Sequence, residues 1–227
     1  MLGLSTENAR VLLLLLLTFV TGSVDAVSYL GLDRVFTANM TGNLALMGFA
    51  ASGAAHLPLV RSASALLAFL AGAVLAGRAV RLADVRATWP LPVTACICAS
   101  VALLTGVFGW WMVQGRAPNP DLLASLLALA MGIQGAATRK LGVADLPTTV
   151  VTSTLTGLAA DSLLAGGPSV RWRRRAGAVC SLLLGAVVGG LLVKVDPPLG
   201  LLPALAVLLL VAGIITAGRL HRPMPQQ

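Results

Sequence analysis

The stretch TFVTGSVDAVSYLGLDRVFTANMTGNLAL, residues 18–46, decides the fold. It begins inside a long apolar run, about 11–31, which is long enough to cross a bilayer as a helix. It then enters a second segment, about 35–52, that is shorter in apolar character and rich in Thr, Asn, Ser and Gly. The number of membrane spans therefore depends on whether segments of this second kind cross the membrane.

The composition indicates a membrane protein. Of the 227 residues, 57% are hydrophobic and 11% are charged, against roughly 25% charged residues in soluble domains. So few charges cannot shield the apolar surface from water, and lipid has to solvate it. The net charge of +8 comes from basic residues that cluster between apolar runs, where they orient helices. They do not interleave with aromatic residues, so we expect no binding of nucleic acid.

Five further apolar runs and one further polar segment complete the pattern. The apolar runs lie at about 62–80, 91–113, 121–139, 175–194 and 198–218, and the polar segment at about 146–165. If both polar segments crossed, eight spans would divide the basic residues nine to seven between the two sides. If neither crosses, six spans divide them twelve to four, which fits the cytoplasmic excess of Lys and Arg far better.

We therefore expect an all-α polytopic membrane bundle of six spans, with both termini in the cytoplasm. The two short polar segments are expected to be re-entrant or broken, so that they dip in and return or lie buried in the bundle. Irregular backbone at membrane depth is tolerated only in such places.

The chain also repeats itself, with an offset of about 111 residues. The matching stretches keep their order: MTGNL at 40–44 with VTSTL at 151–155, and Leu91-Pro92 with Leu202-Pro203. The single membrane domain, 1–227, then has two halves, about 11–113 and about 121–219, of three spans each. Because three is odd, the second half is inverted, and a 3+3 inverted repeat is typical of transporters and some channels with a midplane site.

The N-terminal segment has a second interpretation. Arg10, the leucine run at 11–17 and Val24-Asp25-Ala26 resemble a secretory signal peptide with its cleavage site. The weak charged region before the leucines, and the need for this segment in the repeat, favour a retained span.

Polar side chains of the two short segments and of two spans are the candidate binding residues. They are Asp25, Asn39, Thr41, Asn43, Gln134, Thr149, Thr152, Ser153 and Thr154. Such groups are costly against lipid. A short helix that begins at the midplane would aim free N–H groups at a solute, which favours an anionic or hydrogen-bond-accepting one. The alternative is that these side chains bond neighbouring helices and hold the bundle together.

Asp25 is the most informative single residue. A carboxylate within a span is expensive and is by default a functional hypothesis, in which it binds a proton or a cation or pairs with a basic residue. The alternative places it near the outer interface, where it caps a helix or pairs with Arg34. Its counterpart in the repeat is Ala136, so an ionic role belongs to one half only.

Other residues have structural interpretations beside functional ones. Gln134 suits a hydrogen bond between helices. Asp161 suits an ion pair with the arginine run at 171–175, which also suits lipid headgroups. Gly185 and Gly189 form a small-residue motif that serves either contact within the chain or the seam of a homodimer.

The sequence predicts no enzyme, no cofactor and no metal site. Cys96, Cys98 and Cys180 lie inside apolar runs, and His56 and His221 are isolated from each other. The sequence holds no phosphate-binding glycine loop and no Ser/His/Asp set suited to a triad. An intramembrane enzyme is therefore the third functional hypothesis, behind the two given below.

Two stretches resemble the signature of a known family. TGSVDAVSYLGLDRVFTANMTGN at 21–43 and MGIQGAATRKLGVADLPTTVVTSTLTGLAAD at 131–161 are similar to those of the YoaK-like family, bacterial six-span membrane proteins with a domain of unknown function. The family usually reads Gln-Asn-Ala where this chain has Gln134-Gly135-Ala136, which leaves position 135 without an amide. The resemblance implies the bacterial inner membrane and supplies no substrate.

The leading hypothesis is a small secondary transporter or channel for a small solute of unknown identity, bound at the midplane between the inverted repeats. The alternative is a non-transporting membrane scaffold or assembly partner. The expected partners are the lipid bilayer, the solute and, if the glycine motif forms a seam, a second copy of the chain.

Overall fold

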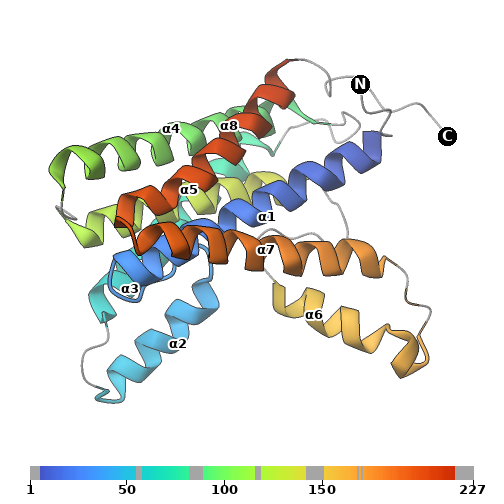
Figure 1. The fold of residues 1–227 in the computed structure, drawn as a ribbon, viewed down its shortest axis with the longest axis horizontal. Coiled ribbons are helices and arrows are strands. Elements are labelled where there is room, and N and C mark those ends of the chain that lie inside the picture. Colours follow the sequence, from blue (N-terminus) through green and yellow to red (C-terminus); the bar gives the residue numbers. More distant parts are fainter. Residues whose placement is uncertain are drawn as a thin grey trace.

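Helices make up most of the part of the chain that the computed structural model describes (Figure 1). The described residues are 6–54, 58–81, 89–115, 119–141, 151–167, 169 and 171–217, and they contain no strand, which confirms the predicted all-α class. In chain order the elements are α1 (Thr6–Gly31), α2 (Met40–Ala51), α3 (Leu59–Ala79), α4 (Leu91–Gln114), α5 (Pro120–Arg139), α6 (Val151–Ala160), η1 (Leu163–Ala165), α7 (Trp172–Val193), η2 (Pro197–Leu201) and α8 (Leu202–Thr216).

Six stretches are long and apolar enough to cross a membrane: α1, α3, α4, α5, α7, and η2 joined to α8. Each has 20 to 25 residues, so each reaches at least about 30 Å, the thickness of a bilayer core. The helices α2 and α6 have 12 and 10 residues, or only about 18 and 15 Å. Six spans are thus confirmed among the described residues. The start of α1 and the end of α8 lie at the same end of the bundle (Figure 1), as an even number of spans requires.

Local sequence signals fix the helix ends. The side chain of Asn119 caps α5 by accepting a hydrogen bond from Leu122 N at 3.0 Å. Pro120 follows in the first turn, where its missing N–H removes no helical hydrogen bond. Gly115 ends α4 with a φ of 70°, a left-handed value that glycine adopts without a steric penalty.

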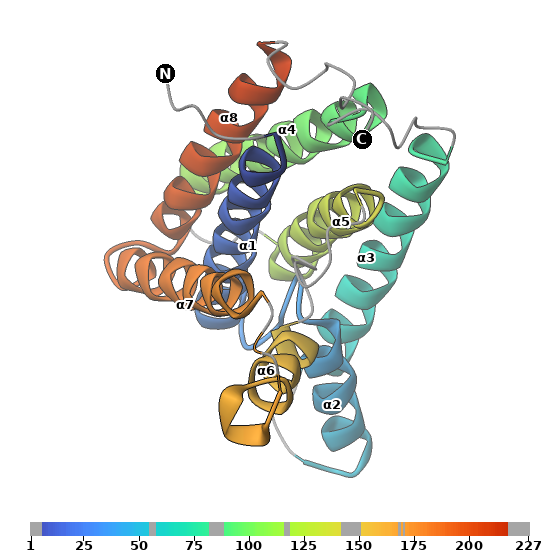
Figure 2. The same cartoon turned by 90° about the vertical axis from the view of Figure 1, so that its right-hand side faces the viewer.

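The spans pack first as two parallel pairs, α1 with α7 and α3 with α5 (Figure 2). Both pairs meet at glycines that bring backbone against backbone. A Cβ added to Gly185 would meet the backbone of Phe19, and one added to Gly72 would meet the backbone of Leu129. Contact within the chain, rather than a homodimer seam, is therefore what Gly185 provides in this structure.

Ion pairs hold the two parallel pairs at their starting ends. Arg174 Nη2 lies 2.6 Å from a carboxylate oxygen of Glu7, joining the starts of α7 and α1. Arg61 Nε lies 2.5 Å from a carboxylate oxygen of Asp121, joining the starts of α3 and α5. These pairs set the register along each glycine contact.

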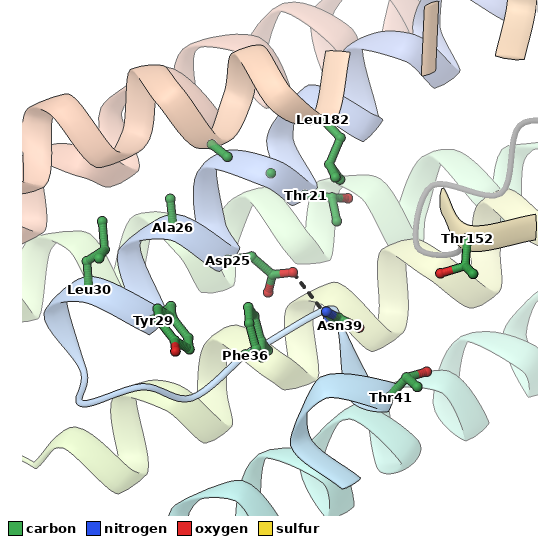
Figure 3. Close-up of a pocket in the computed structure, with 12 residues that line it drawn as sticks. Thr21, Asp25, Ala26, Tyr29, Leu30, Phe36, Asn39, Thr41, Thr152 and Leu182 are labelled. Atoms are coloured by element: carbon green, nitrogen blue, oxygen red, sulfur yellow. Dashed lines mark hydrogen bonds between the residues drawn. The ribbon is translucent and has the colours of Figure 1, made fainter. Parts of the chain in front are cut away.

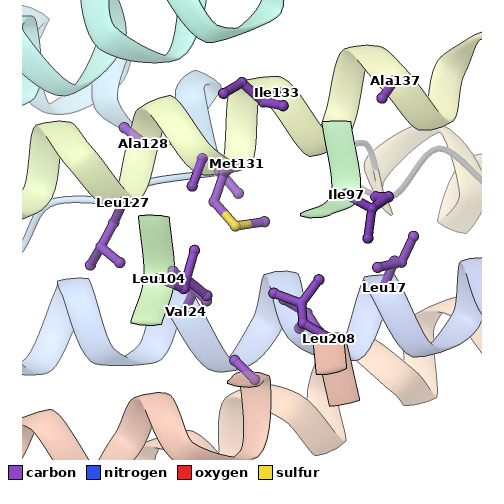
Figure 4. Packing of buried hydrophobic residues seen from close by; sticks show 14 of the residues in the cluster. Leu17, Val24, Ile97, Leu104, Leu127, Ala128, Met131, Ile133, Ala137 and Leu208 are labelled. Carbon is purple, nitrogen blue, oxygen red and sulfur yellow. The ribbon is translucent and has the colours of Figure 1, made fainter. Parts of the chain in front are cut away.

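The helices α1 and α5 cross at the centre of the bundle and run antiparallel. Gln134 Nε2 donates to Leu17 O at 3.3 Å, and Arg10 Nη1 donates to Leu141 O at 3.4 Å, so residue numbers fall along one helix as they rise along the other. These two helices are the most enclosed of the six spans. Figure 4 shows the core between them, which leucines of α4 and α8 complete. The N-terminal segment is thus a central element of the bundle.

Asp161 and the arginine run meet as predicted. Arg175 Nη1 donates to Asp161 Oδ2 at 2.6 Å and to Gly157 O, which ties the end of α6 to the start of α7. Arg175 is buried, while Trp172 beside it is half exposed. The same short segment therefore contains both an internal anchor and an exposed aromatic residue.

Candidate functional site

The site begins with a chain reversal after α1. Asp33 and Arg34 both have left-handed backbone angles, with φ of 63° and 62°, and they turn the chain back along the helix it has just left. The returning loop brings Phe36 onto Tyr29, with ring centroids 4.8 Å apart and planes 27° apart. The loop then reaches Asn39, where α2 starts; this loop, residues 32–39, turns back along α1 and is called the re-entrant loop.

Asp25 binds the returning loop. Its Oδ1 accepts hydrogen bonds from Thr37 N at 2.9 Å, Ala38 N at 2.8 Å and Thr37 Oγ1 at 3.3 Å. Its Oδ2 accepts one from Asn39 N at 3.2 Å. The carboxylate is thus held by backbone N–H groups of the three residues that precede α2. Its partners are these loop groups rather than Arg34.

Two amides fix the start of α2. The side chain of Asn39 caps the helix by accepting from Gly42 N at 3.3 Å. Asn43 is fully buried and bonds both backbone groups of Phe36: its Nδ2 donates to the carbonyl at 2.7 Å, and its Oδ1 accepts from the N–H at 2.9 Å. Asn43 therefore stabilises the loop and does not line a cavity.

A cavity of about 440 Å³ lies beside Asp25 (Figure 3). Its walls come from α1, from the re-entrant loop and the start of α2, from the start of α6, and from the middle of α7. The lining residues are Thr21, Gly22, Asp25, Ala26, Tyr29, Leu30, Phe36, Asn39, Thr41, Thr152, Leu182 and Ala186. The structure thus brings together four of the predicted site residues, which lie on three different helices and the loop before α2.

The other predicted residues lie elsewhere. Thr154 is buried and Ser153 is exposed, and neither lines the cavity. Gln134 lies buried in α5, where it bonds α1 as predicted for a helix-to-helix contact, and its Oε1 has no hydrogen-bond partner among the described residues. Thr149 falls outside the described residues.

The sequence interpretation missed the apolar part of the cavity. Thr21, Asp25 and Tyr29 are four residues apart in succession and share one face of α1, so their spacing was a usable signal. Leu182 and Ala186 have no such signal, because nothing in their own sequence indicates that α7 packs beside α1. Phe36 could not be predicted from the polar pattern, because its side chain is apolar.

The cavity holds one charged side chain, Asp25, among its lining residues. Tyr29, Thr41, Thr152 and Asn39 contribute further polar groups to the lining, and aliphatic groups form much of the remaining wall. Within the described residues there is no group of three His, Cys, Asp or Glu side chains that would hold a metal ion. The arrangement is suited to binding a small amphipathic molecule beside a carboxylate.

Comparison with known proteins gives a family and one curated relative. The family described as "Protein of unknown function (DUF1275)" matches residues 13–215. The UPF0700 transmembrane protein YoaK of Bacillus subtilis (strain 168) is 38% identical over 149 residues, which cover 66% of this chain and 65% of the relative. The chain thus spans a little under two thirds of that relative's length. No solved structure matches.

Proposed function

Since the chain belongs to the DUF1275 family of membrane proteins of unknown function, we propose that it is a small secondary transporter or channel whose solute binds in the cavity beside Asp25. One observation carries the proposal: the polar starts of two non-spanning helices meet an intramembrane carboxylate at one cavity. The cavity extends from Leu30 to Thr21 along α1, which takes it about 14 Å from the helix end, close to mid-membrane depth.

An inverted repeat is part of this proposal, and the helix contacts support it. Gly22 in α1 packs on the backbone of Leu182 in α7, and Gly132 in α5 packs on the backbone of Phe69 in α3. The two contacts correspond under the repeat, and α1 runs antiparallel to α5. Transporters with inverted repeats bind their solutes between the halves.

The same glycine contacts change the residue that corresponds to Asp25 in the second half of the repeat. Gly22 and Gly132 are 110 residues apart, and the burial of α1 follows that of α5 at this offset rather than at 111. Gly135 therefore replaces Ala136 as the counterpart of Asp25. Glycine carries no side chain, so the carboxylate still belongs to one half only.

We also propose that the protein is not an enzyme. Among the described residues that line the cavity, Asp25 is the only carboxylate, and the Tyr29 hydroxyl is the only other acid or base. General acid–base catalysis with two carboxylates needs a partner that this set does not include.

We further propose a bacterial inner-membrane location with both termini in the cytoplasm, because the twelve-to-four division of basic residues favours that orientation.

Reporter fusions after Arg81 and after Gln227 are expected to give cytoplasmic signals, and a fusion after Ala54 is expected to give an external one. A green fluorescent protein reports cytoplasmic positions and alkaline phosphatase reports external ones. The opposite pattern at Arg81 or Gln227 would rule out this orientation.

Water access to the cavity tests transport without knowledge of the solute. In a variant without Cys96, Cys98 and Cys180, we expect Thr41→Cys and Thr152→Cys to react with a membrane-impermeant thiosulfonate. Thiolates form in water and are suppressed in apolar surroundings.

The matched control is Leu209→Cys on α8, whose native side chain is 57% exposed on an apolar helix and should therefore face lipid. It is expected to stay unmodified. Cavity cysteines as unreactive as the one at 209 would contradict a solute pathway and favour the scaffold alternative.

A further inference from the structure

The two carboxylate oxygens of Asp25 accept unequal numbers of hydrogen bonds. Oδ1 accepts three hydrogen bonds, whereas Oδ2 accepts one, from Asn39 N at 3.2 Å. An ionised carboxylate offers about four lone-pair sites, two on each oxygen. Oδ2 therefore keeps one acceptor site, and Asp25 itself lines the cavity (Figure 3).

Two aromatic rings line the same cavity as Asp25. Tyr29 and Phe36 both line the cavity, and their rings are stacked. The face of an aromatic ring carries negative charge density and attracts a cation within about 6 Å of its centre. The hydroxyls of Thr41 and Thr152, which also line the cavity, can accept hydrogen bonds from an ammonium group.

Most of the backbone N–H groups around the start of α2 that could attract an anion already have an acceptor. The N–H groups of Ala38 and Asn39 donate to Asp25, and Gly42 N donates to the side chain of Asn39. No Lys or Arg is among the lining residues in the part of the chain that the structure describes. An anionic solute would therefore meet a carboxylate without a compensating cation, which reverses the preference expected from helix ends alone.

We propose that the solute is a small organic cation with an apolar body. Its ammonium group binds Asp25 Oδ2 and the part of the stacked Tyr29–Phe36 pair that is open to the cavity. Its body lies against the aliphatic wall formed by Leu30, Leu182 and Ala186. This assignment rests on the proposed transport function and gives its substrate class.

The start of α6 is where an anionic solute could bind instead of a cation. Thr152 is the second residue of α6 and lines the cavity, so the positive end of that helix faces the same space. An anion bound there is the alternative that the experiment has to separate from the cation.

Three aromatic probes of similar size and different charge separate the two possibilities. Benzylammonium, benzyl alcohol and benzoate carry one positive charge, none and one negative charge. With the purified full chain in detergent, benzylammonium is expected to raise the melting temperature in a saturable way, because a ligand that binds the folded state stabilises it. Benzyl alcohol and benzoate are expected to give no saturable rise. Tetramethylammonium, in the same measurement, tests whether a positive charge without N–H donors is enough for binding.

Two carboxylate variants locate the binding. Asp25→Asn keeps an oxygen that accepts from the loop and removes the charge, so its affinity for benzylammonium should fall on the order of 10- to 100-fold, the loss of a hydrogen bond to a charged group. Asp33→Asn makes the same change at a side chain that is 68% exposed and outside the cavity, and asparagine tolerates the left-handed backbone there. Its affinity should equal that of the unchanged protein.

Each result decides between the two proposals. Saturable binding of benzoate that exceeds that of benzylammonium would overturn the cation assignment, point to the start of α6, and leave the transport proposal standing. Failure of both ammonium probes while Thr41→Cys and Thr152→Cys remain reactive would overturn the cation assignment alone. Equal affinities in Asp25→Asn and Asp33→Asn would also overturn it. Unreactive cavity cysteines would instead remove the transport proposal on which the assignment rests.

Discussion

Asp25→Ala is expected to lower the free energy of unfolding by about 3 kcal/mol or more, because it leaves several backbone donors without their acceptor. The N–H groups of Thr37, Ala38 and Asn39 all donate to this carboxylate. Alanine offers no acceptor, and the loop has no regular secondary structure that could satisfy these groups. Water entering the cavity would restore only part of the loss.

Thermal or denaturant unfolding in detergent measures this effect, and two other variants interpret it. Asp25→Asn keeps one carbonyl oxygen for Thr37 and Ala38 and should lose much less stability. Asp196→Ala removes a carboxylate for which no hydrogen bond is described, at the start of η2, and should unfold almost like the unchanged protein. If Asp25→Ala unfolded like Asp196→Ala, the carboxylate would not be holding the re-entrant loop.

Gly185→Ala is expected to destabilise the bundle by about 1–3 kcal/mol, the usual range for overpacking a core, and Gly185→Leu to prevent folding. The added Cβ would meet the carbonyl oxygen, carbonyl carbon and Cα of Phe19, which are backbone atoms that no rotamer change can move. The helix α1 cannot retreat easily, since its other side packs against α5 and α8. Refolding yield and melting temperature of the purified variants measure the effect.

A glycine in open space provides the control. An added Cβ at Gly213 in α8 would meet nothing within 4 Å, and alanine is favoured over glycine in a helix by about 1 kcal/mol. Gly213→Ala should therefore be neutral or stabilising. Gly72→Ala, which faces the backbone of Leu129, should resemble Gly185→Ala. Equal stability of Gly185→Ala and Gly213→Ala would show that α1 and α7 do not meet closely.

The spans could be predicted from the sequence because lipid imposes a simple rule on composition. Apolar length and the division of basic residues gave six spans, and the low apolar continuity of two segments predicted that α2 and α6 would not cross. The partners of polar groups could not be predicted in the same way. Asp25 bonds backbone N–H groups, which every sequence contains, so no side chain marked them. Asn43 and Gln134 carry the same amide group as Asn39, which lines the cavity, yet their hydrogen bonds hold them against the loop and against α1.

The walls of the cavity depended on pairings between distant helices. Leu182 lines the cavity only because glycines in α1 and α7 allow the two backbones to touch, and many Gly and Ala positions in this chain have the same local pattern. The choice among them is made by the packing of the whole bundle. Sequence periodicity of one helix does not contain that information.

The hydrogen bonds from the re-entrant loop to Asp25 have a mechanical consequence. They join the last third of α1 to the start of α2, so this side of the cavity moves as one rigid body and the loop cannot serve as a hinge. On the other side, the described contacts of α6 are to α7 and the short η1 that follows it. If the protein transports a solute as proposed, we expect the wall formed by α1 and the loop to stay fixed while the wall formed by α6 moves.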